Sequence, residues 1–374
     1  MAAIPRRPLQ MQQRNEENFV EKSSKNISSR AGTRTALSNI SNIQRRPNIG
    51  TKVKKDAVLD KAPVNKAFTR VKSQTNLQKP RTKPTKIEPV HVLEEEPLGI
   101  EDIDENDLKN PTLCAEYVKD IYRHMRKAER RLQTGDYMSK QSEINVKMRS
   151  ILIDWLIQVQ SRFNLLQETL YLTVYIIDRF LDKHDVIRSE LQLVGVTAML
   201  LASKYEEMFA PEIGDFVYIT DNAYSKIKIR SMEQKILRAI EYDFSNPVCL
   251  NFLRRNSKAG AVDAQKHTLA KYLMELTLID YNLARKLPSE IAAAALYLSI
   301  SLIDESEWTP TLQHYSGYSE EQILPTVTEM AALVLTVDTS RYQAVKTKYS
   351  ATKFLKISRL PELKGPLIKH YAGN

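Results

Sequence analysis

The chain has 374 residues, which is enough for two folded domains and a long tail, and its formal net charge is +10. The charge is uneven, because residues 1–90 hold 20 Lys and Arg against 6 Asp and Glu, so the tail carries +14 and the remainder −4. Cys114 and Cys249 lack metal-ligand spacing and favour a reducing compartment. We expect neither a signal peptide nor a membrane span, since no apolar run reaches about 20 residues.

Residues 1–92 are expected to be a disordered regulatory tail. Basic, polar and proline residues dominate, and only two aromatic residues occur before position 90. Such a segment cannot bury enough apolar surface to offset the entropy of ordering. Within it, the stretch RTALSNISN at residues 34–42 offers a cation, an apolar anchor and a polar end, which an extended peptide can present to a shallow groove.

An acidic linker is predicted at residues 93–110. Eight carboxylates and Pro97 between Leu93 and Asp107 favour an extended, solvated spacer. Asn110-Pro111 then blocks helix and is expected to begin the ordered part. The next element is a predicted helix at residues 114–131, with Tyr117, Ile121 and Met125 on one face.

The remainder predicts an all-α fold of two tandem domains, residues 111–246 and 247–374, each with about five helices. Apolar residues recur at helical spacing, and no strand pattern is present. An echo at an offset of 97 residues maps Gly195 onto Ala292, and Lys204 onto Ser301, so the second copy lacks that cation. The helices are expected at 144–163, 168–181, 189–206, 211–219, 224–242, 265–281, 289–303, 320–336 and 341–349.

Three charges, Arg149, Asp154 and Asp178, interrupt the apolar runs of the first domain. Burying an ion costs several kcal/mol unless a partner compensates, so an Arg149–Asp178 pair between adjacent helices would satisfy both groups. The alternative is that these charges face solvent.

No catalytic centre is expected. The six histidines are scattered without an H-x-x-x-H pair, and no G-x-G-x-x-G, P-loop or nucleophile elbow occurs. The sequence therefore predicts a non-enzymatic binding protein with no cofactor and no metal.

Three stretches of the first domain resemble the first cyclin box of mitotic B-type cyclins: MRSILIDWL, LYLTVYIIDRFL and LVGVTAMLLASKYEE, which begin at residues 148, 170 and 193. The tail motif is similar to their destruction box, with Arg34, Leu37 and Asn42 at the family's motif positions. The resemblance covers roughly residues 110–360 and this motif.

The resemblance implies two cyclin boxes in a non-catalytic subunit that binds and activates a cyclin-dependent Ser/Thr kinase at the G2/M transition. It also implies substrate proteins as partners, and ubiquitin-dependent removal through the anaphase-promoting ubiquitin ligase. Lys52, Lys54 and Lys55 are candidate ubiquitin acceptors, or plain solubilising charges. The chain is expected in cytoplasm and nucleus, moving to the nucleus at mitosis, with no nucleic-acid or membrane partner.

By the same resemblance, Lys204 and Glu233 form the charged pair that holds the kinase's active-site helix, with Tyr205 beside Lys204. A helical stripe Glu233, Leu237, Ile240 and Phe244 would complete this surface. The alternative for its three apolar members is ordinary core.

A second surface implied by the family is a patch for R-x-L peptides of substrates, made by Met148, Ile151, Leu152, Trp155, Leu191 and Gln192. Half of these side chains could equally be core, and we expect Trp155 to be exposed. Gln158 stands where S-phase cyclins have a Glu, which predicts weak docking.

A third surface resembles a phosphate-binding pocket of B-type cyclins. His267 and Lys271 share a helix face, and Arg254-Arg255 precede them. The alternative is a solvated basic face. The set Arg254, His267 and Lys271 is therefore either a phosphate pocket or such a face.

Two rival functions are weighed against a kinase activator. Duplicated cyclin boxes also occur in basal transcription factors, but the folded part is near −4 and has no C-x-x-C. A cyclin-fold pocket protein that only sequesters partners would lack Lys204 and Glu233.

Overall fold

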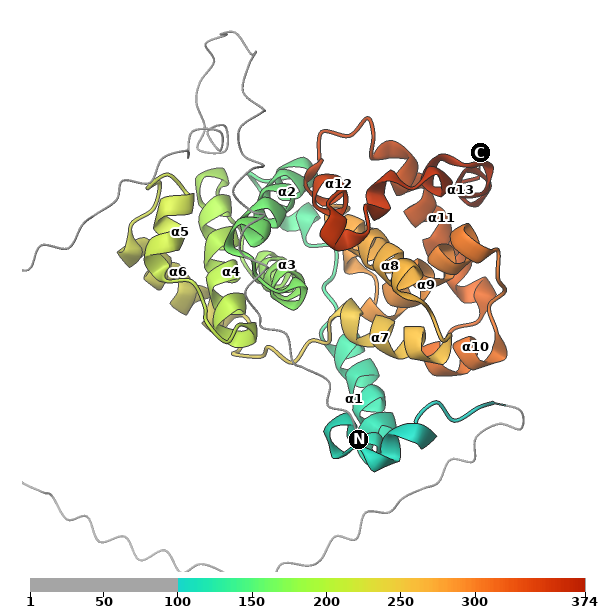
Figure 1. Ribbon diagram of the computed structural model, residues 1–374. Coiled ribbons are helices and arrows are strands. Elements are labelled where there is room, and N and C mark those ends of the chain that lie inside the picture. Colours follow the sequence, from blue (N-terminus) through green and yellow to red (C-terminus); the bar gives the residue numbers. More distant parts are fainter. Residues whose placement is uncertain (1–99, 374) are drawn as a thin grey trace, which may run out of the picture. The chain divides into compact units, whose positions relative to one another are not determined.

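The computed structural model describes residues 100–373, and every regular element in that range is helical (Figure 1). The prediction of an all-α fold without strands is confirmed for these residues. Within the same range, none of the helices combines the length and the apolar character needed to cross a bilayer.

The first box consists of five helices arranged around α4 (Leu191–Glu206), which contacts the other four (Figure 1). Nearly every side chain of α4 is buried up to Ser203, as its apolar composition predicts. A Cβ atom on Gly195 would lie 2.7 Å from Leu152 Cδ1, so the missing side chain lets α2 and α4 approach closely. The other four helices are α2 (Val146–Phe163), α3 (Gln167–Lys183), α5 (Ile213–Ile219) and α6 (Lys226–Ala239).

The second box repeats this plan around α9 (Pro288–Asp304). This helix aligns with α4 at the predicted offset of 97, and Ala292 is completely buried. It packs against α7, α8 and α11. The remaining helices are α7 (Cys249–Ala259), α8 (Ala264–Thr277), α10 (Pro310–Ser316), α11 (Glu320–Thr336), α12 (Ala344–Tyr349) and α13 (Pro366–Tyr371).

The sequence did not reveal α7, α10 and α13. The last two have only seven and six residues, too few to show a helical period. The third, α7, mixes Arg, Asn, Ser and Lys with its apolar residues, and even Arg255 and Asn256 are buried there. Polar residues with buried partners hide the amphipathic pattern on which sequence reasoning relies.

The predicted helix at residues 114–131 starts too early. Cys114 adopts a left-handed conformation (φ 50°) between two short 3₁₀ turns, and α1 spans Val118–Arg131. Two residues of the predicted apolar face, Tyr117 and Ile121, are 62 % and 45 % exposed and do not join the core. Instead, the Tyr122 hydroxyl donates a hydrogen bond to the Asn251 carbonyl of α7 (2.9 Å).

The prediction of an extended, solvated acidic spacer is wrong at Asp104, which is buried, and at Glu105–Lys109, which form a 3₁₀ helix. Asp104 is 5 % exposed and accepts hydrogen bonds from both terminal nitrogens of Arg255, at 2.5 and 2.6 Å. The Arg255 guanidinium lies over the rings of Tyr122 and Tyr315, 5.3 and 4.8 Å from their centroids. This contact, the Asp104 clasp, fixes the chain before α1 to the second box.

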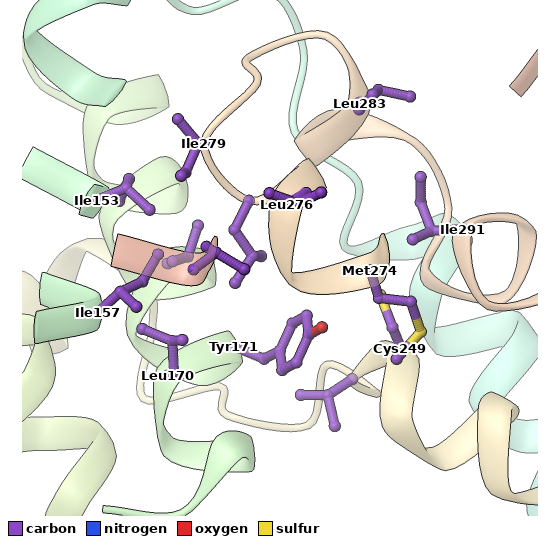
Figure 2. Close-up of a cluster of buried hydrophobic side chains, with 14 of the residues drawn as sticks. Ile153, Ile157, Leu170, Tyr171, Cys249, Met274, Leu276, Ile279, Leu283 and Ile291 are labelled. Atoms are coloured by element: carbon purple, nitrogen blue, oxygen red, sulfur yellow. The ribbon is translucent and has the colours of Figure 1, made fainter. Parts of the chain in front are cut away.

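The two boxes share one hydrophobic core. Figure 2 shows Tyr171 of α3 beside Cys249 of α7 and Met274 of α8, with Ile153 and Ile157 of α2 on the other side of Tyr171. All five side chains belong to one continuous cluster of buried residues. Because apolar burial is the main favourable contribution to folding, the boxes stabilise one another across this junction.

Polar contacts at the junction centre on Arg149, whose side chain is completely buried. Its Nε and Nη2 donate to the two carboxylate oxygens of Asp178 on α3, at 2.8 and 2.7 Å. Its Nη1 donates to the Leu278 carbonyl of the second box (2.9 Å), and Tyr137 donates to Asp178 (2.7 Å). Burial opposes the charge of Arg149, but Asp178 outweighs it and raises the arginine pKa above its usual value.

Candidate functional site

The Lys204–Glu233 ion pair lies at the surface of the first box. Lys204 closes α4, and its side chain is 49 % exposed, whereas Glu233 on α6 is 16 % exposed. A cation in the last turn of a helix is also favoured by the helix dipole. The pair therefore links the last turn of α4 to the middle of α6 and leaves the lysine accessible.

Aromatic side chains flank this pair. Tyr205 is 58 % exposed, and its ring stacks on Phe244, with centroids 5.1 Å apart and ring planes 18° apart. Phe244 lies beyond the end of α6, where Glu241 and Tyr242 adopt left-handed conformations (φ 57° and 58°). These residues turn the chain back, which brings Phe244 to the end of α4.

The predicted helical stripe through Glu233, Leu237, Ile240 and Phe244 is therefore only partly correct. Leu237 is half-buried against the core on the same side of α6 as Glu233. Ile240 is completely buried, and α6 ends at Ala239, so helical spacing does not apply to Phe244. A turn, and not the helix, places Phe244 at this surface.

Two apolar residues at this surface were missed by the sequence reasoning. Met208 and Phe209 follow α4 and are 88 % and 87 % exposed. Large apolar side chains that lie open beside a charged pair indicate an interaction site. The signal in the sequence was available: an apolar pair between Glu207 and Pro211 falls outside any helical period.

The six residues of the predicted docking patch do not form a uniformly exposed surface. Met148, Ile151 and Gln192 are partly exposed. Leu152, Trp155 and Leu191 are 2 %, 4 % and 5 % exposed, so the expectation of an exposed Trp155 is wrong. Helix α2 packs on α4 and α12, and α4 packs on α3, so these side chains belong largely to the core. The Gln192 side-chain nitrogen is buried and has no hydrogen-bond partner among the described residues.

Next to this patch, Asp154 serves the fold. It accepts hydrogen bonds from the Ala344 backbone at the start of α12 (2.9 Å) and from the Gln158 amide (3.2 Å). Burial raises the pKa of Asp154, although both hydrogen bonds oppose that change. Because Asp154 has these partners, it supplies little free negative charge for a bound arginine.

The third predicted set, Arg254, His267 and Lys271, gathers where α7 and α8 face the start of α3. Arg254 forms an ion pair with Glu168 of α3. Burial, and then the charges of Lys271 and Arg254, lowers the pKa of His267. Burial also lowers the pKa of Lys271, although Glu168 opposes it. The charges of Lys271 and Arg254 thus act on His267, and the Glu168 carboxylate already lies among these side chains.

The contacts of Arg255 and His267 determine which side chains line this pocket. Arg255 points away from it, into the Asp104 clasp. His267 Nδ1 lies 2.8 Å from the Ser257 hydroxyl, which orients the imidazole ring.

The destruction-box residues Arg34, Leu37 and Asn42 lie outside the described residues. Within residues 100–373, no three histidine, cysteine, aspartate or glutamate side chains are placed to hold a metal ion. In the same range Cys114 is exposed and Cys249 is buried, and burial raises the pKa of the Cys249 thiol to about 12.

Known families and proteins match this chain along most of its length. The cyclin N-terminal domain family matches residues 120–245, and the cyclin C-terminal domain family matches residues 247–363. A G2/mitotic-specific cyclin-B of Hydra viridissima is 65 % identical over 391 aligned residues, which cover 100 % of this chain and 99 % of the relative. The corresponding protein of Patella vulgata is 60 % identical over 271 residues, covering 72 % of this chain and 66 % of the relative.

Among solved structures, a viral cyclin from Herpesvirus saimiri has the same fold, with a TM-score of 0.50 at 22 % identity. The match covers 62 % of this chain and 98 % of the viral one. Both boxes, in the predicted order, are thus found in one known architecture. The chain belongs to the cyclin family and, within it, to the mitotic B-type cyclins.

Proposed function

We propose that this chain holds its cyclin-dependent kinase at one surface of the first box, which we call the α4–α6 surface. This surface consists of Lys204, Tyr205, Met208, Phe209, Glu233, Leu237 and Phe244. As a mitotic B-type cyclin, the chain is a non-catalytic regulatory subunit that activates such a kinase at the G2/M transition. The observation that carries the proposal is the accessible Lys204–Glu233 pair beside two almost fully exposed apolar side chains.

Physically, binding energy at this surface stabilises one position of the kinase's active-site helix. A ligand shifts a conformational equilibrium by as much as its affinities for the two states differ. Charged groups would fix the orientation of the kinase helix, and the apolar groups would supply buried area.

The test is a kinase assay with the Lys204→Ala/Glu233→Ala variant. Losing a desolvated interfacial pair costs about 2–5 kcal/mol, so binding should weaken at least about 30-fold while the fold persists. The matched control is Lys140→Ala/Asp182→Ala, which removes another ion pair at the surface of the same box (3.3 Å). If the kinase phosphorylates histone equally well with the first variant and with the wild-type chain, at equal concentrations, the proposed surface is refuted.

We further propose that the patch at Met148, Ile151 and Gln192 docks substrate peptides weakly. The partly exposed apolar side chains of Met148 and Ile151 support it, because they offer apolar contact area to a peptide. Gln158→Glu should strengthen the binding of an R-x-L peptide. Unchanged peptide affinity, measured by fluorescence anisotropy, would contradict this role.

The set Arg254, His267 and Lys271 is proposed as a phosphate pocket for a phosphoserine of a partner. Its support is that Arg254 and Lys271 lie close enough to His267 for their charges to act on it, and Glu168 competes with the phosphate for Arg254. Glu168→Gln should therefore raise phosphopeptide affinity, whereas Arg254→Ala with Lys271→Ala should abolish it. Equal affinity in all three proteins would show an ordinary basic face.

Turnover is proposed to depend on Arg34, Leu37 and Asn42, read by the anaphase-promoting ubiquitin ligase. The similarity of RTALSNISN to a destruction box supports this. Arg34→Ala with Leu37→Ala should block degradation in mitotic extract and leave kinase activation unchanged. Degradation at the wild-type rate would show that the motif is a chance match.

Localisation is likewise a proposal: cytoplasmic and nuclear, with movement to the nucleus at mitosis. It rests on the family resemblance, and live imaging of a fluorescent fusion tests it. A signal confined to one compartment through the cell cycle would contradict it.

A further inference from the structure

The side of α6 that faces away from Glu233 carries cations without partners. Positions two residues apart on a helix point about 200° apart, so Lys235 projects from the opposite side to Glu233. Lys228, Lys235 and Arg238 are exposed, and within residues 100–373 none of them pairs with a carboxylate. Lys235 instead lies over the Phe180 ring, 5.6 Å from its centroid.

Two surface hollows adjoin these cations. The first, of about 430 Å³, is lined by His184 from the end of α3 and by Ser231, Gln234, Lys235 and Arg238 of α6. The second, of about 770 Å³, continues from Ser231 and Lys235 and is lined partly by apolar side chains, among them Ile187, Leu193 and Met232. We call the two together the α6 groove.

His184, which lines the first hollow, lies in the electrostatic field of Lys235 and Lys183. Its ring stacks on Phe180, with centroids 4.7 Å apart, and its Nδ1 is buried without a hydrogen-bond partner among the described residues. Burial, and then the charges of Lys235 and Lys183, lowers the pKa of His184. A group under this influence becomes easier to protonate when an anion binds beside it.

The nearby carboxylates do not neutralise this field. Glu241 pairs with Lys183 (2.6 Å), and Asp182 pairs with Lys140 (3.3 Å). Asp185 accepts a hydrogen bond from the Ser142 hydroxyl (2.6 Å). Glu190 lines only the second, larger hollow. The first hollow thus keeps three cationic or protonatable groups and two neutral donors on one side.

We propose that the α6 groove binds a phosphorylated serine or threonine of a partner protein. A phosphate dianion has three acceptor oxygens, which can be shared among Arg238, Lys235 and the Ser231 hydroxyl, whereas a carboxylate has two. The second hollow takes apolar side chains that flank the phosphorylated residue. A long polyanion such as nucleic acid fits less well, because residues 91–374 carry a net charge of −4 and would repel it.

This groove is separate from the Arg254 pocket, which lies on α7 and α8 of the second box and contains Glu168. The two sites are therefore separable by mutation. The experiment uses the full chain, alone and bound to its kinase, in an Arg254→Ala/Lys271→Ala background. The probe is a fluorescent peptide library with one fixed phosphoserine, and the same library with serine is the reference.

The proposal predicts phosphate-dependent binding that Lys235→Ala/Arg238→Ala weakens at least tenfold. The matched control is Lys226→Ala/Arg230→Ala, which removes the same charge from other exposed positions of α6 and should change affinity less than twofold. Arg238→Ala alone is the second variant, because its exposed side chain contributes little to folding. Thermal melting confirms that each variant is folded.

A second readout is site-specific. The His184 pKa, followed by NMR, should rise when the phosphoserine library binds and should not move with the serine library. Four outcomes would overturn the proposal. Three of them are no detectable binding, binding without phosphate dependence, and equal losses in both double variants. The fourth is a response to inorganic phosphate but none to the peptide, which would show an adventitious ion only.

Discussion

The two cyclin boxes share a scaffold but differ at the end of their central helices. Helix α4 ends in exposed Lys204 and Tyr205, and the exposed residues Met208 and Phe209 follow it. At the positions 97 residues later, Ser301 and Leu302 are each 5 % exposed, and Glu305 and Ser306 follow. The duplicated fold thus keeps the core pattern, but within residues 100–373 only the first copy exposes charged and apolar side chains together at the end of its central helix.

The second box contributes differently. It accepts hydrogen bonds from Arg149 and Ser150 through the backbone carbonyls of Leu278 and Ile279, at 2.9 and 2.8 Å. It also holds the segment before α1 through the Asp104 clasp. The second box therefore supports the first box and anchors the segment before α1, whereas the first box presents the α4–α6 surface.

The largest effect is expected from Arg149→Ala, which tests whether the second box supports the first. The substitution leaves Asp178 buried and unpaired, which should lower the free energy of unfolding by about 3–5 kcal/mol. Denaturant unfolding measures this. The control is Lys183→Ala at the end of α3, whose exposed ion pair with Glu241 contributes about 1 kcal/mol at most. Equal stability of both variants would mean that Arg149 is not essential at the junction.

A smaller effect, about 2 kcal/mol, is expected in kinase affinity from Met208→Ala/Phe209→Ala. Both side chains are almost fully exposed, so the melting temperature should not change. Glu305→Ala/Ser306→Ala, at the corresponding positions of the second box, is the control and should leave the affinity unchanged. If both variants bind the kinase equally, the exposed residues after α4 contribute no more to kinase binding than those after α9.

The Asp104 clasp should depend on pH. Burial would raise the pKa of Asp104, but Arg255 and Lys258 outweigh it and lower the pKa below 3.8. Since the folded pKa is lowered, the stabilisation is complete above the unfolded pKa and is lost as the pH falls through the folded value.

Asp104→Asn should weaken the clasp at neutral pH by about 2 kcal/mol, because the buried Arg255 loses its charged partner. Hydrogen exchange of residues 100–113 measures this, and the variant should no longer respond to acid below pH ~4. Identical exchange in both proteins would show that other contacts hold the segment.

The smallest effect concerns the two central helices. Gly195→Ala gains about 1 kcal/mol of helix propensity but forces a methyl group against Leu152, which costs about 1–3 kcal/mol. We expect a net loss near 1 kcal/mol. Ala292→Gly should cost a similar amount, through propensity alone. A higher melting temperature for Gly195→Ala would show that Leu152 moves aside freely.

The sequence by itself determined the helical class, the order of two boxes and the central helices, because these follow from apolar periodicity and from the 97-residue echo. It also predicted the Arg149–Asp178 pair, since a charge within an apolar run needs a partner. Residues in contact over one helical turn leave a local signal, and local signals can be read without coordinates.

Only the tertiary structure decided which side chains remain exposed. Trp155 lies on an apolar stripe and looked accessible, but it is buried. Phe244 joins Tyr205 through a left-handed turn after α6, and Asp104 pairs with a residue 151 positions away. Exposure, turn direction and long-range pairing depend on what the rest of the chain packs against each residue, and no periodicity in one segment carries that information.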